Sequence, residues 1–511
     1  MKVPFLSIFI FVVAVCFSAD SFGDTIINYR IYIDAETGND TNSGVSEKQA
    51  WKTLDKLNSV TFGPGAEIFF RAGRVWIGQL KPQGSGELKK PIIIDKYGNG
   101  PKPLINGLGL KNEGVLYLYN QSYWEINNLE IVNDSEEDGM RKGVEVLAEN
   151  YGIIRHIHLK NLNIHHIRGK ISHGQTGGIQ IRTVADDKKD TRFDDVLIEK
   201  CHIHHVANQG IFLRTPGTRS GIFNYPKTPD WERRKFTNVV IKENIIHHVA
   251  KNAIVVATIE DGLIESNLCS ETALNTTGNT IFTYGALNTV LQYNEGYLNR
   301  SPGADGSLYD ADIGSPGTIW QYSYSHNNAH GLMWFCTHEK DTGIVVRYNI
   351  SINDKGFLIN INFPFQSANI YNNTFYIGKH LSPFIIRENK WKSHTYTYKN
   401  NIVYNDSETA AFLFAGNISK AVQNRTIEKN IFFKTLLAKE IDYTKNMTVD
   451  PQFTARTAND WLIPKMYKLR KESPALKSGE TIPNNGGRDH YGNKIKVGDK
   501  INIGSYNGTG F

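Results

Sequence analysis

Two neighbouring stretches decide the fold of this chain: FDDVLIEKCHIHHVANQGIFLRT at residues 193–215 and FTNVVIKENIIHHVAKNAIVVAT at residues 236–258. Each holds a β-branched strand with alternating apolar residues, a turn rich in Asn or His, and a second short alternating strand. The unit recurs roughly every 22 to 35 residues and contains no helical period. Further copies occupy residues 261–285, 288–314, 317–335, 343–362 and 367–387.

A single unit of this kind cannot bury its own apolar face, whereas stacked units share one continuous core. The spacing fits neither leucine-rich repeats nor four-stranded propeller blades. The sequence therefore predicts an all-β protein, a single-stranded right-handed parallel β-helix (a solenoid), with stacked coils over residues 107–433.

The composition is that of a folded protein. Of 511 residues, 40% are hydrophobic and 21% are charged, with 45 Gly and 17 Pro, which excludes a disordered chain, a collagen and a polytopic membrane protein. The formal net charge of +6 includes no polybasic run. This charge weakly favours an acidic substrate, and the lack of a basic cluster argues against nucleic acid as a partner.

The first 23 residues have the layout of a secretory signal peptide, because one Lys precedes an apolar run that is too short to span a bilayer. We therefore expect a secreted or periplasmic protein with no membrane partner after signal cleavage. Three cysteines remain beyond this segment, Cys201, Cys269 and Cys336. Their number and spacing fit neither a disulfide framework nor a zinc site, which predicts buried thiols.

The two ends carry the caps that an open solenoid requires. Residues 24–106 are predicted to hold an N-terminal cap and the first coils. A capping box at residues 46–49 precedes a short amphipathic helix with Trp51, Leu54 and Leu57 on one side. Residues 434–511 are predicted to form the last coils and a C-terminal cap.

Several of these segments also carry a family resemblance. YIDAETGNDTNSG, AWKTLDKLN, FFRAG, VWIGQL, YSHNNAHG and DPQF resemble secreted bacterial carbohydrate-active members of the pectate-lyase-like superfamily of right-handed parallel β-helix proteins. The resemblance covers nearly the whole chain after the signal peptide. It implies this fold and a polysaccharide or oligosaccharide substrate, but it does not fix the reaction, because the superfamily contains lyases, hydrolases and epimerases.

Alternation along the strands predicts which side chains point outward. With residues such as Ile179, Ile211 and Ile281 inward, one outward column should follow the same strand position from coil to coil. Carboxylates occupy its centre and arginines lie toward its ends, as in a substrate-binding stripe. We predict that the column consists of Arg182, Arg214, Ala257, Tyr284, Asp312, Phe335, Asn360 and Arg387, with Trp334 outward in place of Phe335 if the register slips by one.

Asp310 and Asp312 share one face of a strand, about 6 to 7 Å apart, a spacing compatible with either a retaining or an inverting glycosidase. We predict them as the catalytic pair, with His326 and Glu295 as further catalytic candidates. Arg182, Arg214, Tyr284, Phe335, Asn360 and Arg387 are the predicted substrate-binding residues. The insertion at residues 221–235 should leave the solenoid near this stripe, where Tyr225 and Trp231 could wall a cleft.

The sequence leaves the reaction open. A glycoside hydrolase using the aspartate pair is favoured, and no cofactor is expected. A polysaccharide lyase acting on a uronate-containing glycan is the alternative, with calcium bound at Asp310 and Asp312 as a second role for that pair. A β-helix that binds glycans without catalysis is the third reading.

Histidine pairs recur at His165–His166, His204–His205 and His247–His248, at a similar place in each coil. Such repetition is typical of a stacked turn ladder. The neighbouring Ile and Val supply no carboxylate for a metal, so we expect these histidines to serve the fold.

Overall fold

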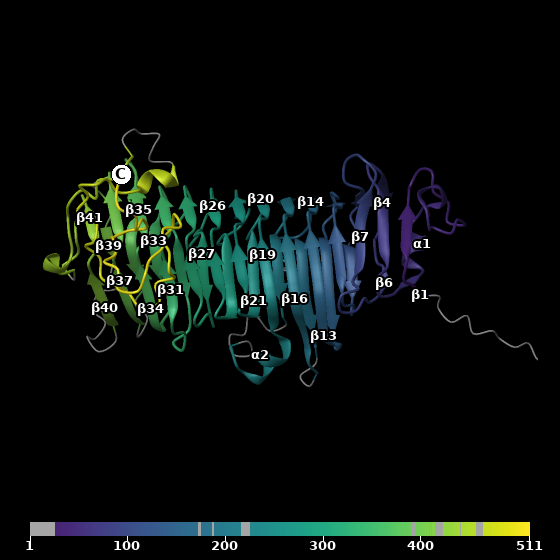
Figure 1. The fold of residues 1–511 in the computed structure, drawn as a ribbon, viewed down its shortest axis with the longest axis horizontal. Coiled ribbons are helices and arrows are strands. Elements are labelled where there is room, and N and C mark those ends of the chain that lie inside the picture. Colours follow the sequence, from purple (N-terminus) through teal and green to yellow (C-terminus); the bar gives the residue numbers. More distant parts are fainter. Residues whose placement is uncertain are drawn as a thin grey trace, which may run out of the picture.

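The computed structural model describes residues 26–171, 175–185, 189–215, 225–389, 394–407, 409, 411–413, 423–439, 441–455 and 463–511. The predicted signal peptide lies outside these ranges. The chain forms one elongated right-handed parallel β-helix, in which each complete coil gives one strand to each of three parallel sheets (Figure 1). The predicted fold class is confirmed, and no linker interrupts the coils between residues 107 and 433 in the described ranges.

Sheet 1 carries the predicted stripe. Its strands, in stacking order, are β9 (Gly114–Tyr119), β12 (Lys142–Glu149), β15 (Gly177–Val184), β18 (Gln209–Arg214), β21 (Ile254–Glu260), β24 (Ile281–Leu287), β27 (Tyr309–Asp312), β30 (Met333–Cys336), β33 (Phe357–Ile361), β36 (Phe384–Glu388) and β39 (Ala411–Leu413).

Sheet 2 follows sheet 1 in each coil, and the two are joined where β19 also pairs with β21. Its strands are β2 (Arg30–Ile33), β4 (Glu67–Arg71), β7 (Ile92–Tyr97), β10 (Trp124–Asn127), β13 (Gly152–Lys160), β16 (Thr191–Glu199), β19 (Phe236–Lys242), β22 (Leu263–Glu265), β25 (Val290–Gln292), β28 (Ile319–Gln321), β31 (Ile344–Arg347), β34 (Phe365–Tyr371), β37 (His394–Lys399) and β40 (Gln423–Glu428).

Sheet 3 runs along the upper side of the solenoid in Figure 1. Its strands are β5 (Val75–Ile77), β8 (Leu104–Asn106), β11 (Glu130–Asn133), β14 (Asn163–Ile167), β17 (His202–Val206), β20 (Ile245–Val249), β23 (Leu268–Ser270), β26 (Glu295–Tyr297), β29 (Tyr324–His326), β32 (Ile350–Ile352), β35 (Thr374–Ile377), β38 (Ile402–Asn405) and β41 (Ile431–Phe433).

The N-terminal end is closed by a three-stranded sheet of β1 (Ile26–Ile27), β3 (Thr61–Phe62) and β6 (Gln83–Gly84), together with helix α1 (Leu54–Asn58). The predicted capping box is wrong, because residues Glu47–Gln49 form a separate 3-10 turn and the Ser46 side chain caps nothing. Instead Thr53 Oγ1 accepts a hydrogen bond from Lys56 N and caps α1. Trp51, Leu54 and Leu57 are buried, as predicted.

The C-terminal segment packs along the side of the last coils. Tyr467, Leu469 and Ile503 join a small core with Ile350 and Ile402, outward residues of sheet 3. This cap therefore covers an apolar outer face of the sheet. Within the described residues, no helix combines the length and apolarity needed to span a membrane.

A ladder of buried asparagines joins successive coils at the turn between sheets 2 and 3. Asn373 Nδ2 donates to Asn401 Oδ1 at 3.0 Å, and Asn373 Oδ1 accepts from the Asn349 backbone N–H at 3.0 Å. In each such turn the preceding residue has a positive φ, for example 55° at Tyr293 and 54° at Asn400. The ladder comprises Asn244, Asn267, Asn294, Asn349, Asn373, Asn401 and Asn430, with Ser323 between Asn294 and Asn349, and it ends on the partly exposed Asn446 beyond the last coil.

The predicted histidine ladder is also present, on the outer side of sheet 3. His165, His204 and His247 stack with ring centroids 4.9 and 5.0 Å apart. Their neighbours His166, His205 and His248 stack at 5.0 and 4.8 Å. Burial and the adjacent imidazoles lower the pKa of His204 to about 3, so that imidazole is neutral at pH 7.

We expect Asn373→Ala to lower the free energy of unfolding by about 2 to 3 kcal/mol, because the Asn349 N–H and the Asn401 amide oxygen each lose a buried partner. Thr395→Ala, at an exposed position of β37, is the control and should change it by less than about 0.5 kcal/mol. Denaturant unfolding of the two variants measures the difference. Equal stabilities would show that the ladder does not hold the coils together.

Candidate functional site

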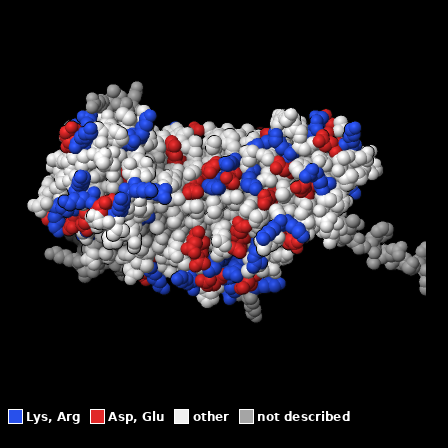
Figure 2. Space-filling view, viewed as in Figure 1, with Lys and Arg blue, Asp and Glu red and all other residues white. Residues whose placement is uncertain are grey.

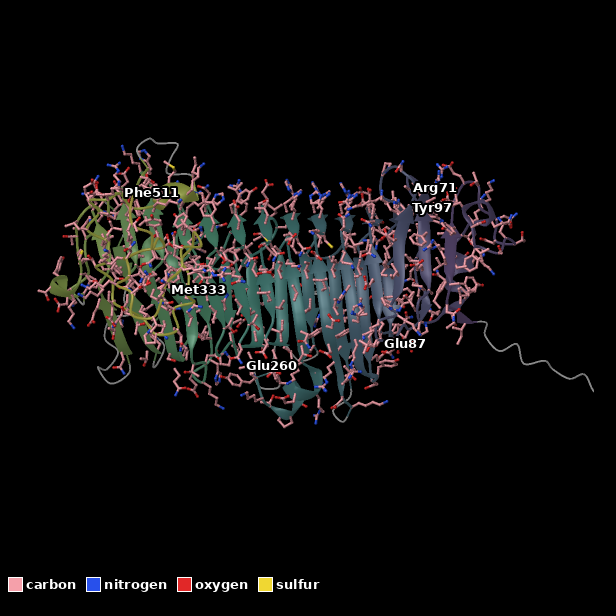
Figure 3. All side chains as sticks on the ribbon, viewed as in Figure 1. Arg71, Glu87, Tyr97, Glu260, Met333 and Phe511 are labelled. Atoms are coloured by element: carbon pink, nitrogen blue, oxygen red, sulfur yellow. The ribbon has the colours of Figure 1, made fainter. Side chains whose placement is uncertain are left out.

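Four aspartates gather around β27 on the outer face of sheet 1. Asp310 and Asp312 lie on the strand itself, Asp305 lies in the turn before it, and Asp341 follows β30 in the next coil. Met333 in Figure 3 marks β30, which pairs with β27. The negative charges of Asp305 and Asp341 raise the pKa of Asp312, and those of Asp312 and Asp305 raise the pKa of Asp310. The cluster thus lies near the middle of the solenoid, as the predicted stripe required.

Asp312 has the protonation behaviour of a general acid. Its side chain is partly exposed, and its Oδ1 accepts a hydrogen bond from the Ile313 N–H at 2.7 Å. Burial, aided by the charges of Asp305 and Asp341, raises the pKa of Asp312 to about 6. This carboxyl group can therefore hold a proton near neutral pH and still reach a ligand.

Asp310 is more enclosed, with 6% of its surface exposed. Asn279 Nδ2 donates to its Oδ2 at 2.8 Å. Burial and the charges of Asp312 and Asp305 raise the pKa of Asp310 well above its ordinary value. Burial and the neighbouring carboxylates thus favour the protonated form of Asp310.

Asp305 was missed by the sequence analysis, because it lies in a turn where strand alternation gives no direction. Its side chain is partly exposed. Burial raises its pKa, opposed by a hydrogen bond from Thr277 and by the charge of Lys251. The Asn279 amide oxygen accepts from the Gly306 and Ser307 N–H groups at 2.9 Å, which fixes the turn next to Asp310.

Buried polar atoms without partners lie on strands and turns of sheet 1, in the coil of the cluster and in coils on either side of it. In the part of the chain that the structure describes, each is buried and makes no hydrogen bond. Such groups are costly unless a ligand or water satisfies them, and convergent polar atoms are typical of a binding site. These atoms are Gln209 Oε1, Asn252 Oδ1, Ser307 Oγ, Asp310 Oδ1, Trp334 Nε1 and Asn360 Oδ1.

Aromatic rings continue the surface beyond Asp310. Trp334 pairs in register with Asp310 and packs edge to face on Phe357, with ring centroids 5.3 Å apart. His330 stacks on Phe357 at 4.0 Å, and the Arg387 guanidinium lies 5.7 Å from the centre of the same ring. Rings beside convergent polar groups are the arrangement that carbohydrate recognition uses.

The insertion covers the other side of the cluster. Tyr225 Oη donates to Asp341 Oδ1 at 3.0 Å, which confirms that this segment lies near the stripe. Trp231, in α2 (Pro229–Arg234), is fully buried and donates from Nε1 to the Gly285 carbonyl at 2.7 Å, so it anchors the insertion and does not wall a cleft. Charged side chains of both signs gather on this lower side in Figure 2, and Glu260 in Figure 3 pairs there with Lys235.

The predicted column is correct in its first half and shifted in its second. Arg182 pairs with Arg214, and Ala257 with Tyr284, as predicted. Phe335 is wrong as a substrate-binding residue, because it pairs with Ala311 and Ile361 and is fully buried in the core. Trp334 takes the outward position, and Asn360 and Arg387 continue the column of Asp310 rather than that of Asp312.

Arg182 has a protein partner. Its Nε donates to Glu145 Oε1 at 2.7 Å, and Lys142 Nζ lies 2.9 Å from the same oxygen. Glu145 and Lys142 are both fully buried, and the sequence analysis singled out neither. Glu145 therefore pairs with both Lys142 and Arg182, and the three ionised groups together carry one positive charge.

His326 and Glu295 lie on sheet 3, away from the aspartates on sheet 1. His326 Nε2 is 3.2 Å from Glu295 Oε1, and its ring stacks between Tyr297 and Tyr324. The structure thus joins these two predicted residues to each other and not to Asp310 and Asp312. The next turn of the coil carries them onto a different face from the aspartate pair, and their catalytic role stays a prediction.

Among the cysteines, Cys201 and Cys269 are buried, as predicted, while Cys336 is partly exposed next to Asp312 in the paired strand. Burial raises the pKa of all three thiols. Calcium binding at Asp310 and Asp312 stays a prediction.

Comparison with known proteins points to glycosidases. Over 470 aligned residues the chain is 28% identical to a lacto-N-biosidase of Bifidobacterium longum subsp. longum, covering 74% of this chain and 29% of that protein's length. It is 25% identical to the crystal structure of a GH136 lacto-N-biosidase from Eubacterium ramulus, with a TM-score of 0.64, covering 74% of this chain and 68% of the other. No protein-family model matches the chain.

A third comparison bears on the fold alone. The complex of XylC with xylose matches with a TM-score of 0.55 at 12% identity, covering 94% of this chain and 98% of the other. Together these comparisons confirm the predicted parallel β-helix fold, and the first two show that the chain is similar to lacto-N-biosidases.

The corrected register gives a stability test. Phe335→Asn places an amide in the apolar core, so we expect a loss of at least about 3 kcal/mol in the free energy of unfolding. Trp334→Asn is the comparison, because Asn360 occupies the same outward column one coil away; it removes a largely buried ring but puts no amide into the core, so it should cost less than Phe335→Asn. Denaturant unfolding separates the two, and the reverse order of losses would restore the original register.

Proposed function

We propose that this chain is a glycoside hydrolase whose active site is the aspartate cluster on β27. The observation that carries the proposal is Asp312, a partly exposed carboxyl group with a pKa near 6, beside Asp305 and among buried polar atoms that lack partners. Glycosidases need one protonated carboxylic acid and one carboxylate on opposite sides of the scissile bond. The relatives named above support this reaction class.

Asp312 is proposed as the general acid that protonates the leaving oxygen. Asp305 is proposed as the carboxylate that acts as nucleophile or base, because it is more accessible than Asp310 and its hydrogen bond from Thr277 favours the ionised form. Asp310 then acts as a positioning residue whose protonated carboxyl keeps a third negative charge out of the site. The original pair, Asp310 with Asp312, remains the alternative that the experiment below separates.

The proposed substrate is an uncharged glycan. Arg182 is engaged by Glu145, and the ionised carboxylates of the cluster would repel a uronate carboxylate. Uncharged amide, hydroxyl and indole groups of Asn252, Ser307, Asn360 and Trp334 suit sugar hydroxyls instead. The names of the relatives make a lacto-N-bioside the first substrate to test. Export from the cytoplasm is proposed on the signal-peptide pattern alone.

We expect Asp312→Asn and Asp305→Asn each to lower kcat on a lacto-N-bioside with a sugar leaving group, which has to be protonated, by at least about 10². Both variants should keep the unfolding midpoint of the wild type. Asp310→Asn is the comparison: an amide still fits beside Asn279, so we expect a loss of less than about tenfold.

The outcome assigns the pair. If Asp310→Asn loses as much activity as Asp312→Asn while Asp305→Asn stays active, the partner of Asp312 is Asp310. Full activity in Asp312→Asn would rule out this site. Formation of an unsaturated uronate, followed by ultraviolet absorbance on acidic polysaccharides, would reveal the lyase alternative instead.

The pKa of Asp312 sets a pH dependence. Because the general acid must be protonated, kcat/KM should fall as pH rises above about 6, and it should fall again at low pH as the partner carboxylate becomes protonated. Above about pH 6, kcat/KM should fall strongly for a substrate with a poor leaving group. It should fall only weakly for a para-nitrophenyl glycoside, whose leaving group needs little protonation. Identical limbs for both substrates would contradict the role of Asp312 as acid.

A further inference from the structure

The histidine ladder on sheet 3 ends in a carboxylate. His247 of β20 pairs in register with Ser270 of β23, so Glu271 takes the place that His248 holds one coil earlier. Like His248 with φ 51°, Glu271 has a positive φ, of 48°. The residues next to His247 and His248 in the sequence supply no carboxylate, but Glu271 supplies one from the next coil.

Backbone geometry turns both histidines of each pair outward. Successive residues of a strand normally point to opposite faces, but the left-handed conformation of His248 rotates its side chain to the side of His247. As a result the two Nδ1 atoms are 2.7 Å apart. The same contact occurs at His204–His205, at 2.8 Å, and at His165–His166, at 2.7 Å.

Three donor atoms converge at the end of this ladder. Glu271 Oε2 lies 3.0 Å from His248 Nδ1, and the donor atoms of His247, His248 and Glu271 all lie within 4.8 Å of one another. All three side chains are partly exposed. The separations of 2.7 and 3.0 Å are those of hydrogen bonds, so protons lie between these atoms in the ion-free protein, and a cation that displaces the protons can occupy the same volume.

We propose that His247, His248 and Glu271 form a binding site for a zinc ion. Two imidazole nitrogens and one carboxylate oxygen are ligands that zinc accepts, with a fourth position left to water. Zinc–nitrogen bonds of about 2.0 to 2.1 Å require donor atoms slightly farther apart than those seen here, which rotation of partly exposed side chains provides.

An outer hydrogen bond supports this assignment. His202 Nε2 lies 2.8 Å from His247 Nε2, so His247 can donate from Nε2 while its Nδ1 presents a lone pair. Zinc-binding histidines commonly make such a bond with their second nitrogen, which fixes the tautomer and orients the ring. The stacked rings of His204 and His205 hold the two ligand imidazoles from the side of the preceding coil.

A second group of three donors is less suitable. Glu125, His156 and His158 also lie within reach of one ion. There, however, Lys160 Nζ lies 2.6 Å from Glu125 Oε2, and Asp195 contacts both imidazoles. These contacts already satisfy the donor atoms, so this group serves as a control.

The site can be tested by titrating the full chain, stripped with a chelator, with zinc chloride in a calorimeter. We expect one equivalent to bind and the thermal unfolding midpoint to rise, because the ion binds the folded coils β20 and β23 together. Glu271→Gln and His248→Ala should each weaken binding at least tenfold. His158→Ala, at the second group, and His166→Ala, two coils away, should leave it within twofold.

Cobalt substitution gives a second readout, since visible absorption bands of four-coordinate cobalt should appear in the wild type and be lost in Glu271→Gln. The conservative Glu271→Gln change keeps size and hydrogen bonding, so a loss of binding there reports on ligation rather than folding. Absence of binding in the wild type would overturn the proposal. So would binding that survives Glu271→Gln, or that His158→Ala or His166→Ala abolishes.

Discussion

The buried amide ladder between sheets 2 and 3 is the interaction on which the rest of the structure depends. The Asn373 side chain, for example, accepts from the Asn349 N–H and donates to the Val346 carbonyl, both in the preceding coil, and it also donates to Asn401 in the next coil. Backbone pairing alone lets two coils slide, because every strand position offers an equivalent donor and acceptor. A side-chain ladder inside the turn, with no solvent to replace it, fixes where each coil begins.

Because each coil begins at a fixed position, equivalent residues of successive coils stack in columns. These columns made part of the structure predictable from the sequence. Alternation in β15, β18 and β24 correctly placed Arg182, Arg214 and Tyr284, and it identified Asp310 and Asp312 as outward residues of β27. The histidine ladder followed from repetition alone. All these inferences needed only periodicity within a coil and similarity between coils.

The failures arise where a strand meets a turn. Leu332 and Met333 both point into the core, because the chain bends as it enters sheet 1, and this doubling moves Trp334 outward and Phe335 inward. Asp305 lies in the turn itself, where no alternation applies. His326 and Glu295 are close to the aspartates in sequence, but they lie on sheet 3 and the aspartates lie on sheet 1. Glu271 could not be joined to His248 without the register of β20 with β23.

Both proposed sites lie where a column of stacked side chains changes from one residue type to another. Val255 and Phe282 precede Asp310 in their column and Trp334 follows it, so a carboxyl group is inserted between apolar side chains that desolvate it and raise its pKa. Glu271 likewise ends a column of three histidines. A column of identical residues stabilises the solenoid by stacking the same side chain from coil to coil. Where one coil carries a different residue, two chemically different side chains lie at the separation set by the strands, about 4.8 Å. The stacking distance that builds the fold is therefore also the distance over which its reactive groups act on one another.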